Sequence, residues 1–234
     1  MKKKLGTLFV ALVLGGTVFA ENYTKGIDLQ FGIPIGVTKM TKDYNVVEFT
    51  QNIIEFGGQF KVATYDCFLL NDMLGIYASV GVNLGGFFAH DKLSVSRRDT
   101  DLGKFGLDEL GFSTSLEFMV GPAFGVNLGG VRFQTGLGFH GVVAWGWYSY
   151  DYEETFHSGR SLNKVKYTAL GLALTPQFRF GASKRCSFIL GCDLAFDFPN
   201  KLTCEIERHN EVEIEFDKGF RFGATPYIGL GINF

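Results

Sequence analysis

The chain has 234 residues, the length of a single domain, with a formal net charge of −2 and an aromatic content of 15%. This charge balance gives no basis for a nucleic-acid partner. Its 31 glycines and many aromatic residues, against only 5 prolines, indicate β-structure, and no segment after Ala20 is long and apolar enough for a membrane helix.

Residues 1–20 have the pattern of a secretory signal peptide. Three lysines, Lys2 to Lys4, precede an apolar core, and the segment ends with small residues at Val18 and Ala20. We expect cleavage after Ala20. Of the 22 basic residues 19 then remain, against 24 acidic ones, so residues 21–234 carry a formal charge of −5. Such an exported chain is either a soluble secreted domain or an outer-membrane barrel.

Eight segments alternate apolar residues with polar or small ones, in the period of two that is typical of β-strands. The first has Ile27, Leu29 and Phe31 on one face, with Asp28 and Gln30 on the other. The apolar face of every segment lacks charged residues, so the sequence predicts a sheet with two very different faces. In chain order the segments are 26–37, 53–65, 74–88, 112–126, 131–148, 167–180, 186–198 and 220–234.

Residue size indicates which face points outward. The apolar face is rich in large Phe, Leu and Ile residues, whereas the other is rich in Gly, Ala and Ser with single charges. The interior of a closed eight-stranded barrel is just wide enough for side chains to fill, which suits the small residues. The sequence therefore favours an eight-stranded antiparallel transmembrane β-barrel over a soluble ligand-binding barrel, whose apolar face would point inward.

The connections between these segments alternate between short and long. The connections 66–73, 127–130 and 181–185 are short, and the others are long, namely 38–52, 89–111, 149–166 and 199–219. Short periplasmic turns, long extracellular loops and an even number of strands are typical of outer-membrane barrels. Pro226 lies deepest in its segment, where its missing N–H should interrupt the ladder, and a local bulge is one explanation.

The inward face carries five acids, four bases and one histidine. They can form a paired network that closes a narrow lumen, because unpaired buried charges are costly. They can also line a polar path for protons or small solutes, since residues in the lumen tune selectivity in barrels. These residues are Asp28, Glu55, Lys61, Glu117, Arg132, His140, Arg179, Asp193, Asp197 and Arg221.

Trp145 and Trp147 lie near the outer end of the fifth segment, on the apolar face. Two tryptophans there indicate an aromatic girdle at the membrane interface, the alternative being a site where a sugar or lipid stacks. No arrangement suits a catalytic, metal or cofactor site. The adjacent pair His157-Ser158 lies in a long connection with no strand to fix it, and the glutamates around His209 are typical of a solvated loop.

The end of the chain carries the most specific motif, with Tyr227 followed by apolar residues at every second position from Ile228 to Phe234. It resembles the terminal signal of small eight-stranded outer-membrane proteins, which include the transmembrane domain of outer membrane protein A, outer membrane protein X and the opacity proteins. The resemblance covers residues 21–234 and implies insertion by the barrel-assembly machinery as a monomer among outer-membrane lipids. The assembly residues are Tyr227, Ile228, Leu230, Ile232 and Phe234.

Two functions are compatible with this pattern. A non-enzymatic surface protein would use its external loops for adhesion or another interaction with a host or cell-surface ligand. The alternation of 202–216 suggests that the last two strands continue outward as a hairpin around His209-Asn210, whose edge could pair with a partner strand. The alternative is a narrow channel for small solutes. We favour the surface protein, because paired inward charges would fill the lumen.

Overall fold

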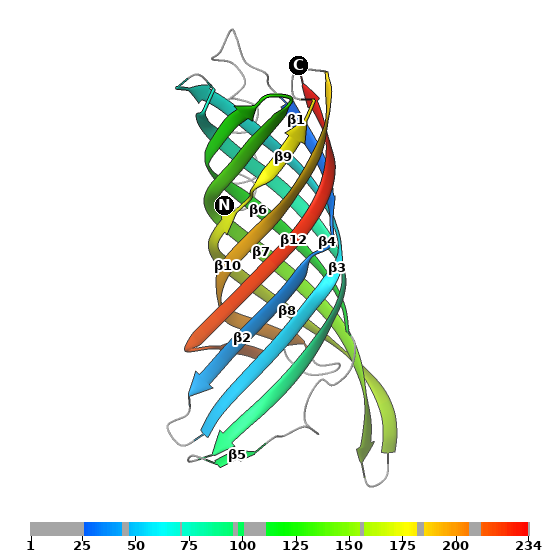
Figure 1. The fold of residues 1–234 in the computed structure, drawn as a ribbon. Coiled ribbons are helices and arrows are strands. Elements are labelled where there is room, and N and C mark those ends of the chain that lie inside the picture. The colour runs from blue at the N-terminus through cyan, green and yellow to red at the C-terminus, as the bar shows by residue number, and fades with distance from the viewer. Residues whose placement is uncertain are drawn as a thin grey trace, which may run out of the picture.

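In the computed structural model, the described residues are 26–43, 47–70, 72–95, 98–100, 111–154, 157–181, 185–205 and 212–233. They form twelve strands of one antiparallel sheet (Figure 1). None of the described residues forms a helix long and apolar enough to cross a membrane. The strands are β1 (Gly26–Gly32), β2 (Ile35–Asp43), β3 (Val47–Leu69), β4 (Leu74–Val95), β5 (Arg98–Thr100), β6 (Gly111–Leu128), β7 (Val131–Glu154), β8 (His157–Leu174), β9 (Gln177–Phe180), β10 (Cys186–Glu205), β11 (Val212–Glu215) and β12 (Lys218–Asn233).

The sheet closes into a barrel because the first and last strands pair with each other. Ile27 of β1 lies opposite Ile232 of β12, and β12 pairs on its other side with β10. Around the ring of described strands the order is β1 with β2, then β3, β4, β6, β7, β8 with β9, β10 and β12. The described strands occupy eight positions in this ring, and the predicted antiparallel β-barrel is confirmed.

β1 and β2 are one barrel strand interrupted at 33–34. The register with β12 is unchanged across the interruption, since Gly32 pairs with Tyr227 and Ile35 pairs with Ala224. β8 and β9 are related in the same way across 175–176. The sequence did not predict either interruption, although a proline lies in both: Pro34 in the first and Pro176 in the second.

Pro226 causes no bulge in the pairing of β12 with β10, where it lies opposite Cys192 in continuous register. Its carbonyl oxygen accepts a hydrogen bond from the Ile33 N–H at 3.0 Å. The amide and carbonyl of one residue in an antiparallel strand point toward the same neighbour, so the missing N–H of Pro226 faces the interruption in the first strand. On the other side, the Cys192 N–H donates to the carbonyl of Pro176 at 3.0 Å. Both interruptions therefore lie in one band across four neighbouring strands.

The large apolar side chains point away from the barrel axis, as the alternation predicted. Phe139 is 72% exposed and Leu170 is 67% exposed, whereas Asp28, Gln30 and Asp197 on the opposite face are fully buried. An apolar outer wall around a polar interior is the reverse of a soluble domain, and it is the arrangement that lipid requires.

The two ends of the barrel differ. The turn end, with the connections 70–73, 129–130 and 181–185, also holds Gly26 and Asn233. At the hairpin end, β7 and β8 stay paired as far as Glu154 and His157 (Figure 1). Strands therefore take up most of the residues predicted as long loops, which corrects that prediction. Outside the membrane both faces of a strand meet water, so the apolar alternation that reveals a strand disappears there.

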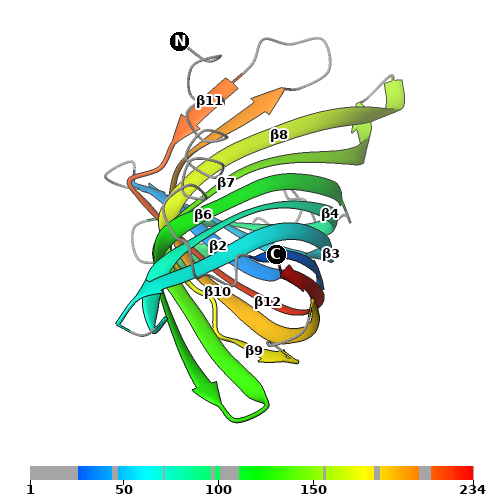
Figure 2. The same ribbon diagram turned by 90° about the horizontal axis from the view of Figure 1, so that it is seen from above.

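The predicted outward continuation of the last two strands is present in part. β11 pairs with the far end of β10, where Cys204 lies opposite Val212, and Figure 2 shows this part of β10 between β11 and β8. The expected tip at His209-Asn210 lies outside the described residues, as does the segment 1–20.

Candidate functional site

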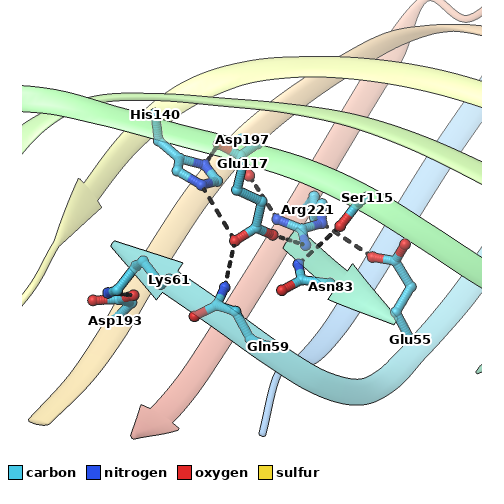
Figure 3. Close-up of polar contacts among 10 residues, drawn as sticks. All are labelled: Glu55, Gln59, Lys61, Asn83, Ser115, Glu117, His140, Asp193, Asp197 and Arg221. Carbon is cyan, nitrogen blue, oxygen red and sulfur yellow. Dashed lines mark hydrogen bonds and ion pairs between the residues drawn. The ribbon is translucent and has the colours of Figure 1, made fainter. Parts of the chain in front are cut away.

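The middle of the barrel holds a charge cluster centred on Arg221 of β12 (Figure 3). Its guanidinium donates to Asp197 of β10 at 2.8 Å, to Glu55 of β3 at 3.1 Å and to Glu117 of β6 at 3.3 Å. The Arg221 side chain is only 6% exposed and that of Asp197 is fully buried. One cation thus holds three carboxylates from three different strands.

Each of these carboxylates has a second partner. His140 of β7 has Nδ1 at 2.7 Å from Asp197 Oδ1 and Nε2 at 3.9 Å from Glu117 Oε2. The Gln59 amide donates to Glu117 at 3.0 Å, and the Tyr167 hydroxyl donates to Glu55 at 2.5 Å. Satisfied charges of this kind behave as a structural unit, because removing one partner leaves the others buried and uncompensated.

Two further ion pairs lie closer to the turn end. Lys61 of β3 pairs with Asp193 of β10, and its ammonium lies 4.2 Å from the ring centroid of Tyr227. Arg179 of β9 pairs with Asp28 of β1. Both pairs join strands that are not neighbours in the ring, so they also cross the interior.

Glutamine amides continue this network around Asp28. The Gln177 amide donates to Asp28 at 3.4 Å and to Gln134 at 3.2 Å, and it accepts from Gln30 at 3.2 Å and from the Tyr227 hydroxyl at 3.1 Å. The interior near the turn end is therefore polar but occupied.

Apolar side chains close the interior on both sides of the charge cluster. On the turn side, the rings of Tyr65 and Tyr77 lie 4.4 Å apart, and Tyr65 donates to the Thr175 carbonyl at 2.9 Å. On the hairpin side, a buried group that we call the outer plug packs together. The outer plug comprises Met40, Ile53, Phe87, Val142, Ala144, Tyr167, Ala169 and Phe216.

The outer plug was not predicted from the sequence. A signal for it exists, because Ile53-Ile54, Phe87-Phe88 and Val142-Val143 are consecutive apolar pairs. In a strand, consecutive side chains point to opposite faces, so one member of each pair must point inward. Ile54 and Phe88 are exposed on the outer wall, whereas Ile53 and Phe87 are buried.

Little space remains in the middle of the barrel. A cavity of about 30 Å³ lies among Lys61, Glu117, His140, Asp193 and Arg221. That is the volume of roughly one water molecule. A larger cavity of about 340 Å³ opens at the turn end, where Tyr65 and Arg179 are among the lining residues.

Arg132 lies apart from the central cluster, contrary to the prediction of one inward charge network. It is half-buried at the turn end, where it donates to Asn127 at 3.1 Å and to the Asp72 carbonyl at 2.5 Å. Arg132 is the second residue of β7, so it lies beside the turn and lines the cavity at the turn end instead of reaching the central cluster. Period-two alternation gives the face of a residue but not its height along the barrel.

The two tryptophans and the described residues of the terminal motif lie on the predicted faces. Trp145 and Trp147 are half-exposed on the outer wall, where Trp147 lies 5.9 Å from the Phe112 ring. Ile228, Leu230 and Ile232 of β12 are exposed outward and Tyr227 is buried inward. Phe234 lies outside the described residues.

At the hairpin end, outside the apolar wall, Asp217 joins the start of β12 to the end of β2. Its carboxylate accepts from the Asp43 N–H at 2.9 Å and from the Lys42 ammonium at 3.2 Å. These two donors lower the pKa of Asp217 from its ordinary value. Within the described part of the chain, no three His, Cys, Asp or Glu residues are grouped as metal ligands would be.

No protein-family model matches the chain, and no curated protein sequence matches it. Solved structures do. A major outer membrane protein from Thermus thermophilus is 14% identical, with a TM-score of 0.52, covering 90% of this chain and 99% of that one. The outer membrane protease OmpT from Escherichia coli is 10% identical, with a TM-score of 0.50, covering 92% and 99%. The fold is therefore that of outer-membrane β-barrel proteins, as the sequence resemblance predicted.

Proposed function

We propose that this chain, which has the fold of outer-membrane β-barrel proteins, is a non-enzymatic surface protein that acts through the hairpins beyond its hairpin end. The observation that carries this proposal is the filled interior. Arg221 holds carboxylates from three strands, and the outer plug lies between that cluster and the hairpin end. A protein whose lumen is filled in this way has its accessible chemistry outside the barrel.

The length of the strands supports a function at the hairpin end. On β7 the outward residues from Val131 to Val143 are apolar except for Thr135, and at a rise of about 3.3 Å per residue and a tilt of about 40° they span roughly 30 Å along the barrel axis. β7 continues for eleven residues, from Ala144 to Glu154, paired with β8. Ladders that extend beyond the membrane present strand edges with which a partner chain can pair.

We propose a host or cell-surface molecule as the partner, and a monomer as the working state. Three trimmed variants test this: one without most of 89–111, one without most of 199–219, and one with the β7–β8 ladder shortened beyond Trp147 and Lys164. Each should keep the heat-dependent gel mobility of a folded barrel. We expect at least one of them to lose binding to host cells or matrix. Full binding by all three would leave a structural role in the membrane.

A narrow channel is the second candidate, favoured by the cavity of about 340 Å³ at the turn end. Residues such as Glu55, Glu117, Arg132 and Arg179 would have to line its path. It requires the outer plug to move, because Phe87 and Val142 are buried across that path. Conductance separates the two candidates.

The cellular setting belongs to the same proposal: export, cleavage after Ala20 and insertion by the barrel-assembly machinery. Amino-terminal sequencing of protein from outer-membrane fractions should begin at Glu21. Because one structural relative is a protease, the purified protein should also be incubated with a peptide library. Hydrolysis that persists after trace proteases are removed would overturn the non-enzymatic part.

A further inference from the structure

A depression of about 220 Å³ lies on the outer wall, at the hairpin end of β7 and β8, and we call it the rim pocket. Its outward side chains are Trp145, Trp147, Lys164 and Lys166, with Thr203 of β10 beside them. The register places each tryptophan opposite a lysine, Trp145 opposite Lys166 and Trp147 opposite Lys164. Thr203 lies opposite Lys166 on the other side of β8. Two indoles, two ammonium groups and one hydroxyl therefore converge on one hollow.

The rim pocket lies where the outer wall changes from apolar to polar. Along β8, the outward residues are Leu174, Leu172 and Leu170, then Thr168, then Lys166. On β7, the two tryptophans follow Val143 in the same direction. Tryptophan and lysine at such a boundary reach the headgroup level of a bilayer while their neighbours contact acyl chains.

The exposed wall below the pocket is suited to an acyl chain. Phe139 lies opposite Leu172, and Gly141 lies opposite Leu170. Phe139 and Leu170 are among the most exposed apolar side chains of the described wall. A ligand in the pocket can thus place a polar anionic part against the lysines and an apolar part along this wall. That combination describes a lipid rather than a soluble anion.

The two lysines are not equivalent. The register sets Lys164 opposite Glu205 of β10, whereas Lys166 faces Thr203 and Trp145. Lys166 is exposed, and its neighbours on both sides are uncharged. It is therefore the lysine best placed to meet a phosphate without competition from a carboxylate.

We propose that the rim pocket binds one membrane lipid whose phosphate-bearing headgroup has a net negative charge, with Lys166 donating to the phosphate and Trp145 and Trp147 flanking the headgroup. The proposal rests on the membrane placement proposed above. It goes beyond an aromatic girdle, because a girdle has no preference for one lipid headgroup.

The chain has only 2 tryptophans, and both line the rim pocket, so tryptophan fluorescence, excited where tyrosine does not absorb, reports on this site alone. Purified protein is reconstituted in phosphatidylcholine bilayers, and part of the lipid is replaced by brominated phosphatidylglycerol or brominated phosphatidylcholine, whose bromine quenches tryptophan. We expect wild-type protein to prefer phosphatidylglycerol by about fivefold or more, the selectivity of one lysine near a charged surface. Lys166→Gln should remove most of this preference.

The matched control is the double variant Lys39→Gln and Lys218→Gln, which removes exposed lysines at the same end of another sector of the wall and should keep the preference. Equal quenching by both lipids in wild type, or an unchanged preference in Lys166→Gln, would refute the lipid site. Release of the quenching by excess inorganic phosphate would also refute it, in favour of a free-phosphate site. Absence of quenching by bilayers made wholly of brominated phosphatidylcholine would instead contradict the membrane placement itself.

Discussion

Arg221 Nη2 lies 3.3 Å from Glu117 Oε1, although β12 and β6 stand on opposite sides of the barrel with three strand positions between them in either direction. An ion pair across the full width of the interior leaves no open lumen at that height. Since Arg221 also holds Asp197 and Glu55, one side chain joins a large part of the circumference.

Arg221→Gln should therefore destabilise the barrel strongly. Three carboxylates would lose their shared cation, and breaking a buried ion pair from one side costs about 3–5 kcal/mol. The free energy of unfolding can be measured by urea titration of protein folded in vesicles, followed by gel mobility. Lys218→Gln is the matched control, because Lys218 is exposed at the start of the same strand. Similar midpoints for the two variants would show that the network contributes little.

The outer plug can be tested at Phe87. A Cβ added to Gly111 would lie 2.3 Å from the Phe87 ring, so Gly111→Ala should clash and cost about 1–3 kcal/mol of stability. The same substitution in a Phe87→Ala background should cost much less, because the ring is gone. A double-mutant cycle gives this coupling energy directly. Additive effects would mean that Phe87 does not pack where the structure places it.

The faces of the strands could be predicted from the sequence, but their ends and the sealing of the lumen could not. Ile27, Leu29 and Phe31 reveal a strand because lipid lies on one side and the interior on the other. Beyond Tyr148 on β7 that contrast fades, so the sequence predicts a loop over 149–166 where β7 and β8 continue as paired strands. The interior positions of Phe87 and Ile53 were not predicted, because in each pair of consecutive apolar residues only the outward one fits the alternation that identifies the strand. The pairing of Arg221 with Glu117 depends on strand stagger, which alternation does not encode.

Assembly should depend on the end of the chain. Ile232 is exposed on the outer wall opposite Ile27, and Phe234 follows two residues later with the same parity. Replacing Phe234 with Asn should lower the amount in the outer membrane severalfold while export to the periplasm continues. The control is Phe188→Asn, a phenylalanine on the outer wall of β10 that lies outside the terminal motif. Immunoblots of membrane fractions measure both variants, and equal loss in the two would remove any special role of the terminus.

The contacts that Asp217 makes at the hairpin end should depend on pH. Because its pKa is lowered in the folded protein, its contacts with Asp43 and Lys42 contribute above the ordinary pKa of an aspartate and are lost as pH falls through the lowered value. NMR titration of the Asp217 carboxyl should give a midpoint below 3.8. The Asp43 amide should shift with the same midpoint, and this shift should vanish in Asp217→Asn. An ordinary midpoint would mean that these contacts do not persist in solution.

Conductance of the purified protein in planar bilayers tests the filled interior most directly. With Arg221 paired across the lumen and the outer plug in place, we expect no steady current at any salt concentration. Phe87→Ala combined with Arg221→Gln, if it still inserts, is the variant expected to leak. A steady, salt-dependent conductance of the wild-type protein that changes when Glu117 or Arg132 is neutralised would contradict the account and establish a channel.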